Sequence, residues 1–193
     1  MRRFSLFSLL IFLSLFNISA SSTDFVEREE VRQFINEMVS EHEFNADELS
    51  SLFAKAKISS SILKAISRPA EAKPWFKYRK IFLTSDKIKQ GVKFLEENRE
   101  TLLRAEEMYG VPVEIIVAII GVETRYGRYV GNYKVINSLS TLAFEYPKRS
   151  KFFRSELKQF LVLAREQGMD PMSVKGSYAG AMGIPQFISS SYR

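Results

Sequence analysis

The sequence of 193 residues contains no cysteine and only one histidine, His42. Without cysteine the chain can form neither disulfide bonds nor the thioether anchor of a lipoprotein, and thiolate metal sites are excluded. One histidine is too few for a multi-histidine metal centre and argues against His-based catalytic triads. Glycine-rich phosphate loops and EF-hand patterns are also missing. The sequence therefore predicts no metal and no cofactor, and chemistry based on carboxylates, hydroxyls and amides.

Concentrated basic runs are missing too, which argues against a nucleic-acid-binding protein. The formal net charge of +6 falls to +4 if residues 1–20 are removed, and a modest positive charge suits an anionic polymer as partner. Residues 1–20 themselves are predicted to be a secretory signal peptide. Arg2 and Arg3 precede an apolar run over 4–16 that is short for a membrane span, and Ile18-Ser19-Ala20 resembles a cleavage site.

Strand patterns of useful length are absent, so the predicted fold class is all-α. The composition, 46% hydrophobic, is sufficient for one core of ordinary size. Residues 21–68 are predicted to form an N-terminal helical segment that packs on the core. Pro69 and Pro74 mark a break, after which residues 69–193 form the core itself.

Capping residues predict where several of the helices begin, and Asn137 is one of them, at the start of a helix that contains Leu139, Leu142 and Phe144. Asn45 or Asp47 can cap a helix of the N-terminal segment. Thr84 or Ser85 can cap a long helix in the core that continues to Gly110.

The next stretch, from Gly110 to Gly127, is almost wholly apolar and ends near a single carboxylate, Glu123. Pro112 suits the first turn of a helix, and the pattern predicts a helix that is buried on all sides. Apolar surroundings disfavour the ionised form of a carboxyl group, so Glu123 is predicted to hold a proton near neutral pH and to act as a general acid. The alternative is a solvated helix-end glutamate that pairs with Arg125 or Arg128.

Two further stretches each allow two interpretations. The segment Trp75–Phe82 mixes large aromatic residues with basic ones, which suits either half-buried packing or a wall of a carbohydrate-binding groove. The block Lys175–Phe187 is rich in small residues, and its three glycines let the backbone approach either a packed helix or a ligand.

Three motifs in this order resemble the lytic murein transglycosylases of the B type: GVETRYG over 121–127, TLAFEYPKR over 141–149, and KGSYAGAMGIPQF over 175–187. The resemblance implies a lysozyme-like helical core that acts on the glycan strands of peptidoglycan in the periplasm or cell envelope, with a peripheral association with the envelope. The implied reaction cleaves the β-1,4 bond between N-acetylmuramic acid and N-acetylglucosamine without adding water, and leaves a 1,6-anhydro sugar end.

The resemblance also assigns site residues. Glu123 matches the catalytic acid/base. Six residues match substrate-binding positions: Tyr78, Lys148, Arg149, Ser177, Gln186 and Phe187. Lys148 stands where the family often has arginine, so a bidentate contact with a carboxylate becomes a point-charge contact. Members of the family continue beyond the position of Arg193, so the core is expected to be C-terminally incomplete.

Two other functions remain open from the sequence. A lysozyme-type hydrolase needs a second carboxylate, for which Glu145 or Asp170 is available. A non-catalytic peptidoglycan-binding fragment is the other alternative.

Overall fold

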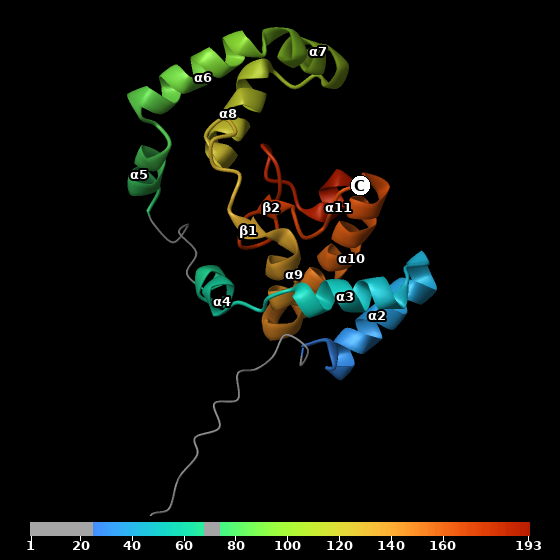
Figure 1. Ribbon diagram of the computed structural model, residues 1–193. Helices are drawn as coiled ribbons and strands as arrows, with labels where there is room; N and C mark the ends of the chain where they lie inside the picture. Colours follow the sequence, from blue (N-terminus) through green and yellow to red (C-terminus); the bar gives the residue numbers. More distant parts are fainter. Residues whose placement is uncertain (1–24, 68–73) are drawn as a thin grey trace, which may run out of the picture.

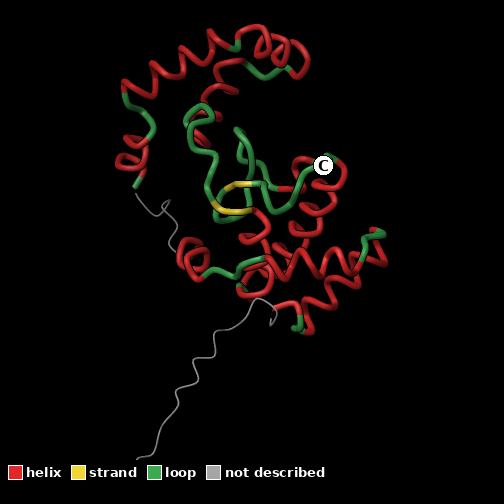
Figure 2. Tube along the Cα trace, in the orientation of Figure 1, coloured by secondary structure: helices red, strands yellow, loops and turns green. Residues whose placement is uncertain are grey.

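The computed structural model describes residues 25–67 and 74–193, and these residues are mainly helical (Figures 1 and 2). The predicted signal peptide and residues 68–73 lie outside the described residues. The elements in chain order are α2 (Glu29–His42), α3 (Ala46–Lys55), α4 (Ser60–Ile66), α5 (Trp75–Tyr78), η2 (Arg79–Ile81), α6 (Ser85–Glu97), α7 (Arg99–Tyr109), α8 (Val113–Thr124), β1 (Tyr133–Lys134), α9 (Val135–Glu145), η3 (Pro147–Arg149), α10 (Ser150–Glu166), β2 (Lys175–Gly176) and α11 (Ser189–Tyr192).

The predicted caps at Asn45 and Thr84 are present, whereas the predicted cap Asn137 lies inside α9, which begins at Val135. The Asn45 side chain accepts hydrogen bonds from the backbone N–H groups of Asp47 (2.8 Å) and Glu48 (3.1 Å). The Thr84 hydroxyl accepts one from the N–H of Lys87 at 3.3 Å. The long helix predicted from this cap is, however, two helices, α6 and α7, which meet at Asn98. Asn98 has a non-helical backbone (φ −117°, ψ 16°), and its side-chain amide donates to the carbonyl of Phe94.

The larger of two hydrophobic clusters is built on α9 and α10, with the N-terminal helices α2, α3 and α4 packed over them. Phe34 and Phe53 are fully buried and meet edge to face at 5.8 Å between ring centroids. Polar groups of α9 also hold the connection between α3 and α4: Asn137 accepts from the N–H of Lys57 at 3.0 Å, and Thr141 from that of Ser59 at 3.1 Å. Residues 25–62 thus share a core with α9 and α10, while the proposed domain boundary at residue 68 remains a prediction.

A second, smaller cluster joins α6, α7 and α8, so the described residues have two hydrophobic clusters where the sequence predicts one core. Its buried members are Leu102, Val113 and Val117, with Phe94 and Tyr126 packed against them. In Figure 1 these three helices form an arch above the rest of the chain. None of the helices within 25–67 and 74–193 combines the length and apolar character needed to cross a membrane.

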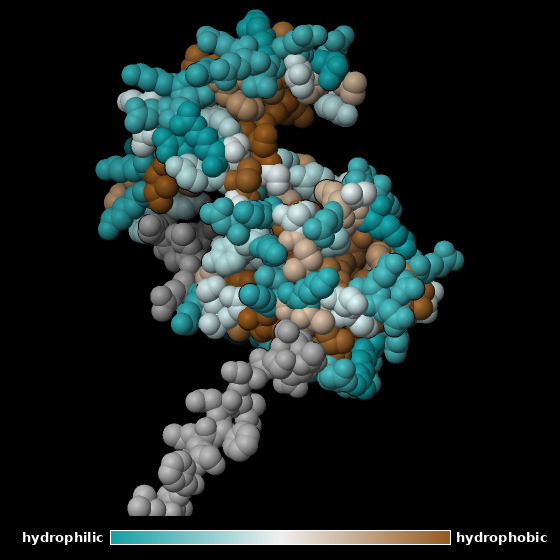
Figure 3. Space-filling model, in the orientation of Figure 1, coloured by the Kyte–Doolittle hydropathy of each residue, from teal (hydrophilic) through white to brown (hydrophobic). Residues whose placement is uncertain are grey.

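The prediction that α8 is buried on all sides is wrong. Ile115, Ile119 and Val122 are about half exposed, at 50%, 51% and 50%. The physical reason is that α8 packs against α6 and α7 on one side only, and the described residues place no element over the opposite side. Figure 3 shows hydrophobic residues gathered along the exposed part of this arch.

We predict that Gly91→Ala destabilises the chain although Gly91 lies inside α6. Alanine in a helix interior is normally favoured over glycine by about 1 kcal/mol. Here a Cβ at Gly91 would lie 2.5 Å from the Tyr126 Oη and 3.2 Å from its Cζ, so the ring has to move. In a Tyr126→Phe background the closest clash is removed and only the 3.2 Å approach to Cζ remains, so the same substitution is expected to be much less destabilising.

Urea unfolding of the four chains measures the coupling between the two positions, which we expect to be about 1–2 kcal/mol. Additive effects of the two substitutions would show that the Tyr126 ring does not depend on the space at Gly91.

Candidate active site

Glu123 lies in the last turn of α8, and its side chain is exposed. The predicted burial is therefore wrong for the described residues, because Ile119 and Val122 beside it are themselves uncovered. The alternative of a helix-end ion pair is not observed either. Among the described residues no basic group lies within salt-bridge distance of Glu123, and Arg125 instead donates to the Gln90 side chain at 2.8 Å.

The turn after Glu123 is sharp and strained. Arg125, Tyr126 and Gly127 all have positive φ (51°, 62° and 80°), which side-chain-bearing residues rarely adopt. The surroundings hold this conformation in place. The Tyr126 ring lies between Gly91 and Gly121 and packs on Phe94 at 5.5 Å. Strain that persists because neighbouring groups fix it is typical of functional sites, and here it determines where α8 ends.

Thr124 joins the end of α8 to the small-residue block. Its side chain is buried, its hydroxyl donates to the carbonyl of Ile184 at 2.9 Å, and it accepts from the N–H of Gly127 at 2.9 Å. Because Thr124 follows Glu123 directly, the loop that carries Gln186 and Phe187 is fixed next to the helix end that carries the carboxylate. Glu123 and the small-residue block therefore belong to one region of the molecule.

Ser177 organises the first half of that block. Strand β2 pairs with β1, with Gly176 opposite Tyr133, and the Ser177 N–H donates to the carbonyl of Ala181 at 2.8 Å. The Ser177 hydroxyl accepts from the N–H groups of Ala179 (3.2 Å) and Ala181 (3.0 Å), which closes a tight turn. These contacts use the oxygen as an acceptor, so its own hydrogen is available to donate to an acceptor such as an amide carbonyl.

Gln186 and Phe187 lie in the second half, a hairpin closed by two backbone hydrogen bonds between Met182 and Phe187 (2.8 and 3.2 Å). Gln186 has φ +52°, and its side-chain N–H₂ donates to the carbonyls of Val130 (3.1 Å) and Gly183 (2.9 Å), which leaves its oxygen as an acceptor. The Phe187 ring is 46% exposed and packs edge to face on Tyr192 at 5.7 Å. Burial raises the pKa of Tyr192, whose hydroxyl donates to the Met182 carbonyl.

The other predicted binding residues lie elsewhere. Tyr78 is half-buried in α5, where its ring packs on Trp75 (6.3 Å) and Phe82 (5.1 Å). Lys148 and Arg149 are exposed and lie in η3, which follows the C-terminal end of α9. Strand β1 precedes the N-terminal end of the same helix, and the two ends are about 16 Å apart. No hydrogen bond or salt bridge within the described residues joins these three to Glu123.

The two carboxylates considered for a hydrolase are engaged elsewhere. Glu145 forms an ion pair with Arg28, and the Asp170 carboxylate accepts from the N–H of Met172 at 2.9 Å. A cavity of about 590 Å³ lies behind the small-residue block, between Leu163, Val174, Met182 and Tyr192, and does not include Glu123. Within residues 25–67 and 74–193 no group of three or more acidic or histidine side chains is placed to hold a metal ion.

Sequence reasoning missed two residues that position the site. Thr124 is separated by 60 residues from its hydrogen-bond partner Ile184, so no local pattern reveals the contact. Ser138 is fully buried in α9, and its hydroxyl donates to the carbonyl of Ser177 at 3.2 Å. The only available signal for Ser138 was a hydroxyl residue on the apolar side of a helix, which usually has a hydrogen-bond partner when buried.

Comparisons with known proteins agree with one another. Residues 26–193 match the family described as Transglycosylase SLT domain. Over 187 residues the chain is 42% identical to the membrane-bound lytic murein transglycosylase B of Escherichia coli (strain K12), with 92% of this chain and 52% of that protein covered. The crystal structure of soluble lytic transglycosylase SltB1 from Pseudomonas aeruginosa is similar with a TM-score of 0.82 and 54% identity, covering 85% of this chain and 56% of SltB1.

The Escherichia coli lytic transglycosylase Slt35 in complex with calcium is similar with a TM-score of 0.83 and 44% identity, covering 88% of this chain and 54% of Slt35. The chain therefore spans about half the length of the relatives that it matches.

Proposed function

Because the chain belongs to the Transglycosylase SLT domain family, we propose that Glu123 and the block from Ser177 to Phe187 form the site of a peptidoglycan lytic transglycosylase. The all-α, lysozyme-like fold predicted from the sequence is confirmed by the solved relatives. The proposed reaction cleaves the β-1,4 bond between N-acetylmuramic acid and N-acetylglucosamine and leaves a 1,6-anhydromuramyl end.

The observation that supports this proposal most strongly is the Thr124 contact. It holds a lone carboxylate beside a loop that carries a hydroxyl donor, an amide acceptor and an exposed aromatic ring. Such groups suit a sugar with an N-acetyl substituent, because the ring can stack on a sugar face and the polar groups can hydrogen-bond the amide. The Pseudomonas aeruginosa relative SltB3 has been crystallised with NAG-NAM-pentapeptide, a peptidoglycan fragment.

In the proposed mechanism, protonated Glu123 donates its proton to the glycosidic oxygen as the bond to the muramic anomeric carbon breaks. The 6-hydroxyl oxygen of the same muramic residue then forms a bond to that carbon, and its proton returns to Glu123. The nucleophile is part of the substrate, so no water is consumed and no second carboxylate is required, in contrast to ordinary glycosidases. A glycan strand bound over Phe187 and the exposed face of α8 would exclude water from Glu123 and so favour its protonated form.

Tyr78, Lys148 and Arg149 remain predicted substrate-binding residues. The exposed positions of Lys148 and Arg149 suit contacts with carboxylates of peptide stems rather than with the scissile bond. We also propose that the chain acts in the periplasm or cell envelope. This localisation is supported by the leader pattern of residues 1–20 alone, and cell fractionation with an antibody to the chain tests it.

Digestion of purified sacculi tests the proposed reaction. We expect soluble muropeptides with 1,6-anhydromuramyl ends, identified by mass spectrometry because each is lighter by one water than the hydrolysis product. Products that contain the added water would instead indicate a lysozyme-type hydrolase.

The exposure of Glu123 favours one alternative, a fragment that binds peptidoglycan without cutting it. The described residues place no apolar element over this carboxylate, and Ile119 and Val122 beside it are themselves exposed. Sedimentation of the chain with sacculi, without release of soluble muropeptides, would identify that function.

A further inference from the structure

The segment from Pro74 to Lys89, which we call the basic–aromatic arm, exposes large apolar side chains to solvent. Trp75 is 69% exposed, Phe76 59% and Leu83 64%. The Tyr78 ring contacts the rings of Trp75 and Phe82, but Trp75, Phe76 and Leu83 still present most of their surface to solvent. In Figure 1, α5 lies at the outer edge of the molecule, and exposed apolar surface of this kind marks an interaction site.

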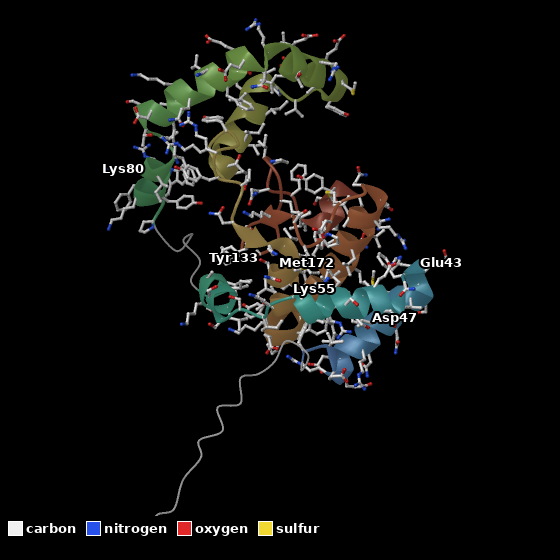
Figure 4. All side chains as sticks on the ribbon, viewed as in Figure 1. Glu43, Asp47, Lys55, Lys80, Tyr133 and Met172 are labelled. Atoms are coloured by element: carbon white, nitrogen blue, oxygen red, sulfur yellow. The ribbon has the colours of Figure 1, made fainter. Side chains whose placement is uncertain are left out.

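The arm is also strongly basic. It contains five basic residues, Lys77, Arg79, Lys80, Lys87 and Lys89, against the single acid Asp86. None of these bases forms a salt bridge with a carboxylate in the part of the chain that the structure describes. Figure 4 labels Lys80 at the outer edge of the molecule. The Lys77 ammonium lies over the Phe76 ring at 5.8 Å, so charge and apolar surface are presented together.

We propose that the basic–aromatic arm binds the surface of an anionic lipid bilayer. Tryptophan and phenylalanine partition into the interface between headgroups and acyl chains, and neighbouring lysine and arginine side chains contact lipid phosphates. This charge complementarity distinguishes the arm from the exposed face of α8. The only charged residues of α8 are Glu114 and Glu123, which anionic lipids repel.

A glycan strand is the competing partner for an aromatic surface, and the observations favour lipid. Sugars stack on aromatic rings, but the arm also exposes the aliphatic side chains of Ile81 (41%) and Leu83, which offer no stacking face. Aliphatic groups gain free energy by entering the acyl region of a bilayer. The inference does not depend on the proposed lytic activity, because none of these exposed apolar residues is assigned to the reaction.

Trp75 provides a local test because it is the only tryptophan in the sequence. The full chain is mixed with phosphatidylcholine vesicles, with or without phosphatidylglycerol, whose acyl chains carry bromine as a quencher. We expect a blue shift and quenching of Trp75 emission only with phosphatidylglycerol, and reversal by high salt. Insertion of any other segment of the chain leaves Trp75 unquenched, so the signal reports on the arm.

Charge reversal by Lys77→Glu with Lys80→Glu is expected to weaken this vesicle binding at least about tenfold, and Leu83→Asp should weaken it too. Ile119→Asp on α8 is the matched control, because Ile119 is also an exposed apolar side chain (51%, against 64% for Leu83), and it should leave quenching unchanged. Circular dichroism verifies that each variant is folded.

Three results would overturn the inference: quenching that is independent of lipid charge, equal loss in Ile119→Asp, or a Trp75 shift with soluble glycan strands but not with vesicles. The last result would assign the arm to glycan binding and leave the lytic proposal intact. Absence of anhydro products from sacculi would disprove the lytic proposal and leave the arm's inference unchanged.

Discussion

Glu123→Gln is expected to lower the release of 1,6-anhydromuramyl products by at least about 10²- to 10⁴-fold, the usual contribution of general acid–base catalysis. Glutamine has nearly the same shape as glutamate but cannot donate a proton to the glycosidic oxygen. The folded state should be unaffected, within about 0.5 kcal/mol, because Glu123 is exposed and forms no salt bridge in the described part of the chain. Quantitative mass spectrometry of sacculus digests and urea unfolding measure the two effects.

Glu114→Gln is the matched control for this prediction. Glu114 is the other carboxylate of α8, is also exposed, and lies in the first turn, at the opposite end of the helix. The chemical change and the change in net charge are identical, so any general effect of charge on binding to an anionic polymer appears in both variants. Equal product yields from the two variants would remove Glu123 from the mechanism.

Features fixed by local interactions were predictable from the sequence. Asn45 and Thr84 cap their helices because a side-chain oxygen reaches backbone N–H groups two or three residues later, which depends on nearby residues alone. The helical nature of α8 could likewise be predicted from Pro112 at its start and from an almost wholly apolar composition, which two glutamates interrupt only near the ends. The position of Glu123 at the end of that helix could also be read from the sequence.

Features that depend on distant partners were not predictable in this way. The burial of α8 was predicted wrongly. An apolar sequence indicates that a helix can be buried, but whether it is buried depends on the other elements that pack against it. The positive φ angles of Arg125 and Tyr126 carry no sequence signal, since neither residue is glycine or asparagine. They are held by Gln90, Gly91 and Phe94 on a different helix.

The candidate site therefore combines a carboxylate whose place on a helix was predictable from nearby residues with a loop whose position depends on distant contacts. The carboxylate sits on a helix end whose direction is set by the packing of Tyr126, and the binding groups sit on a loop tied to that end by Thr124. The small-residue block was recognised by its resemblance to a family rather than by physical reasoning, because glycines alone do not reveal what approaches them. In the structure the group that approaches Gly180 is the side chain of Leu139 in α9.

Gly180→Ala is accordingly expected to destabilise the chain more than the same substitution at Gly168, a glycine of positive φ whose surroundings are open. Gly180 has φ +84°, and a Cβ there would lie 2.5 Å from Cδ2 and 2.8 Å from Cγ of Leu139. Leu139 is 1% exposed, so it cannot move aside without disturbing the core. We expect a loss of about 3–4 kcal/mol, of which about 1–2 kcal/mol is backbone strain and the remainder overpacking.

Gly168→Ala isolates the backbone contribution. Gly168 also has positive φ (+61°), but no atom lies within 4 Å of its Cβ position, so only the strain of about 1–2 kcal/mol is expected. The difference between the two variants in urea unfolding measures the contact between the small-residue block and α9. Because this contact supports the turn that Ser177 closes, Gly180→Ala should also weaken binding to sacculi while Gly168→Ala does not. Equal unfolding free energies would show that the block is not packed tightly against α9, and the close approach of Gly180 to Leu139 would then have no energetic role in forming the site.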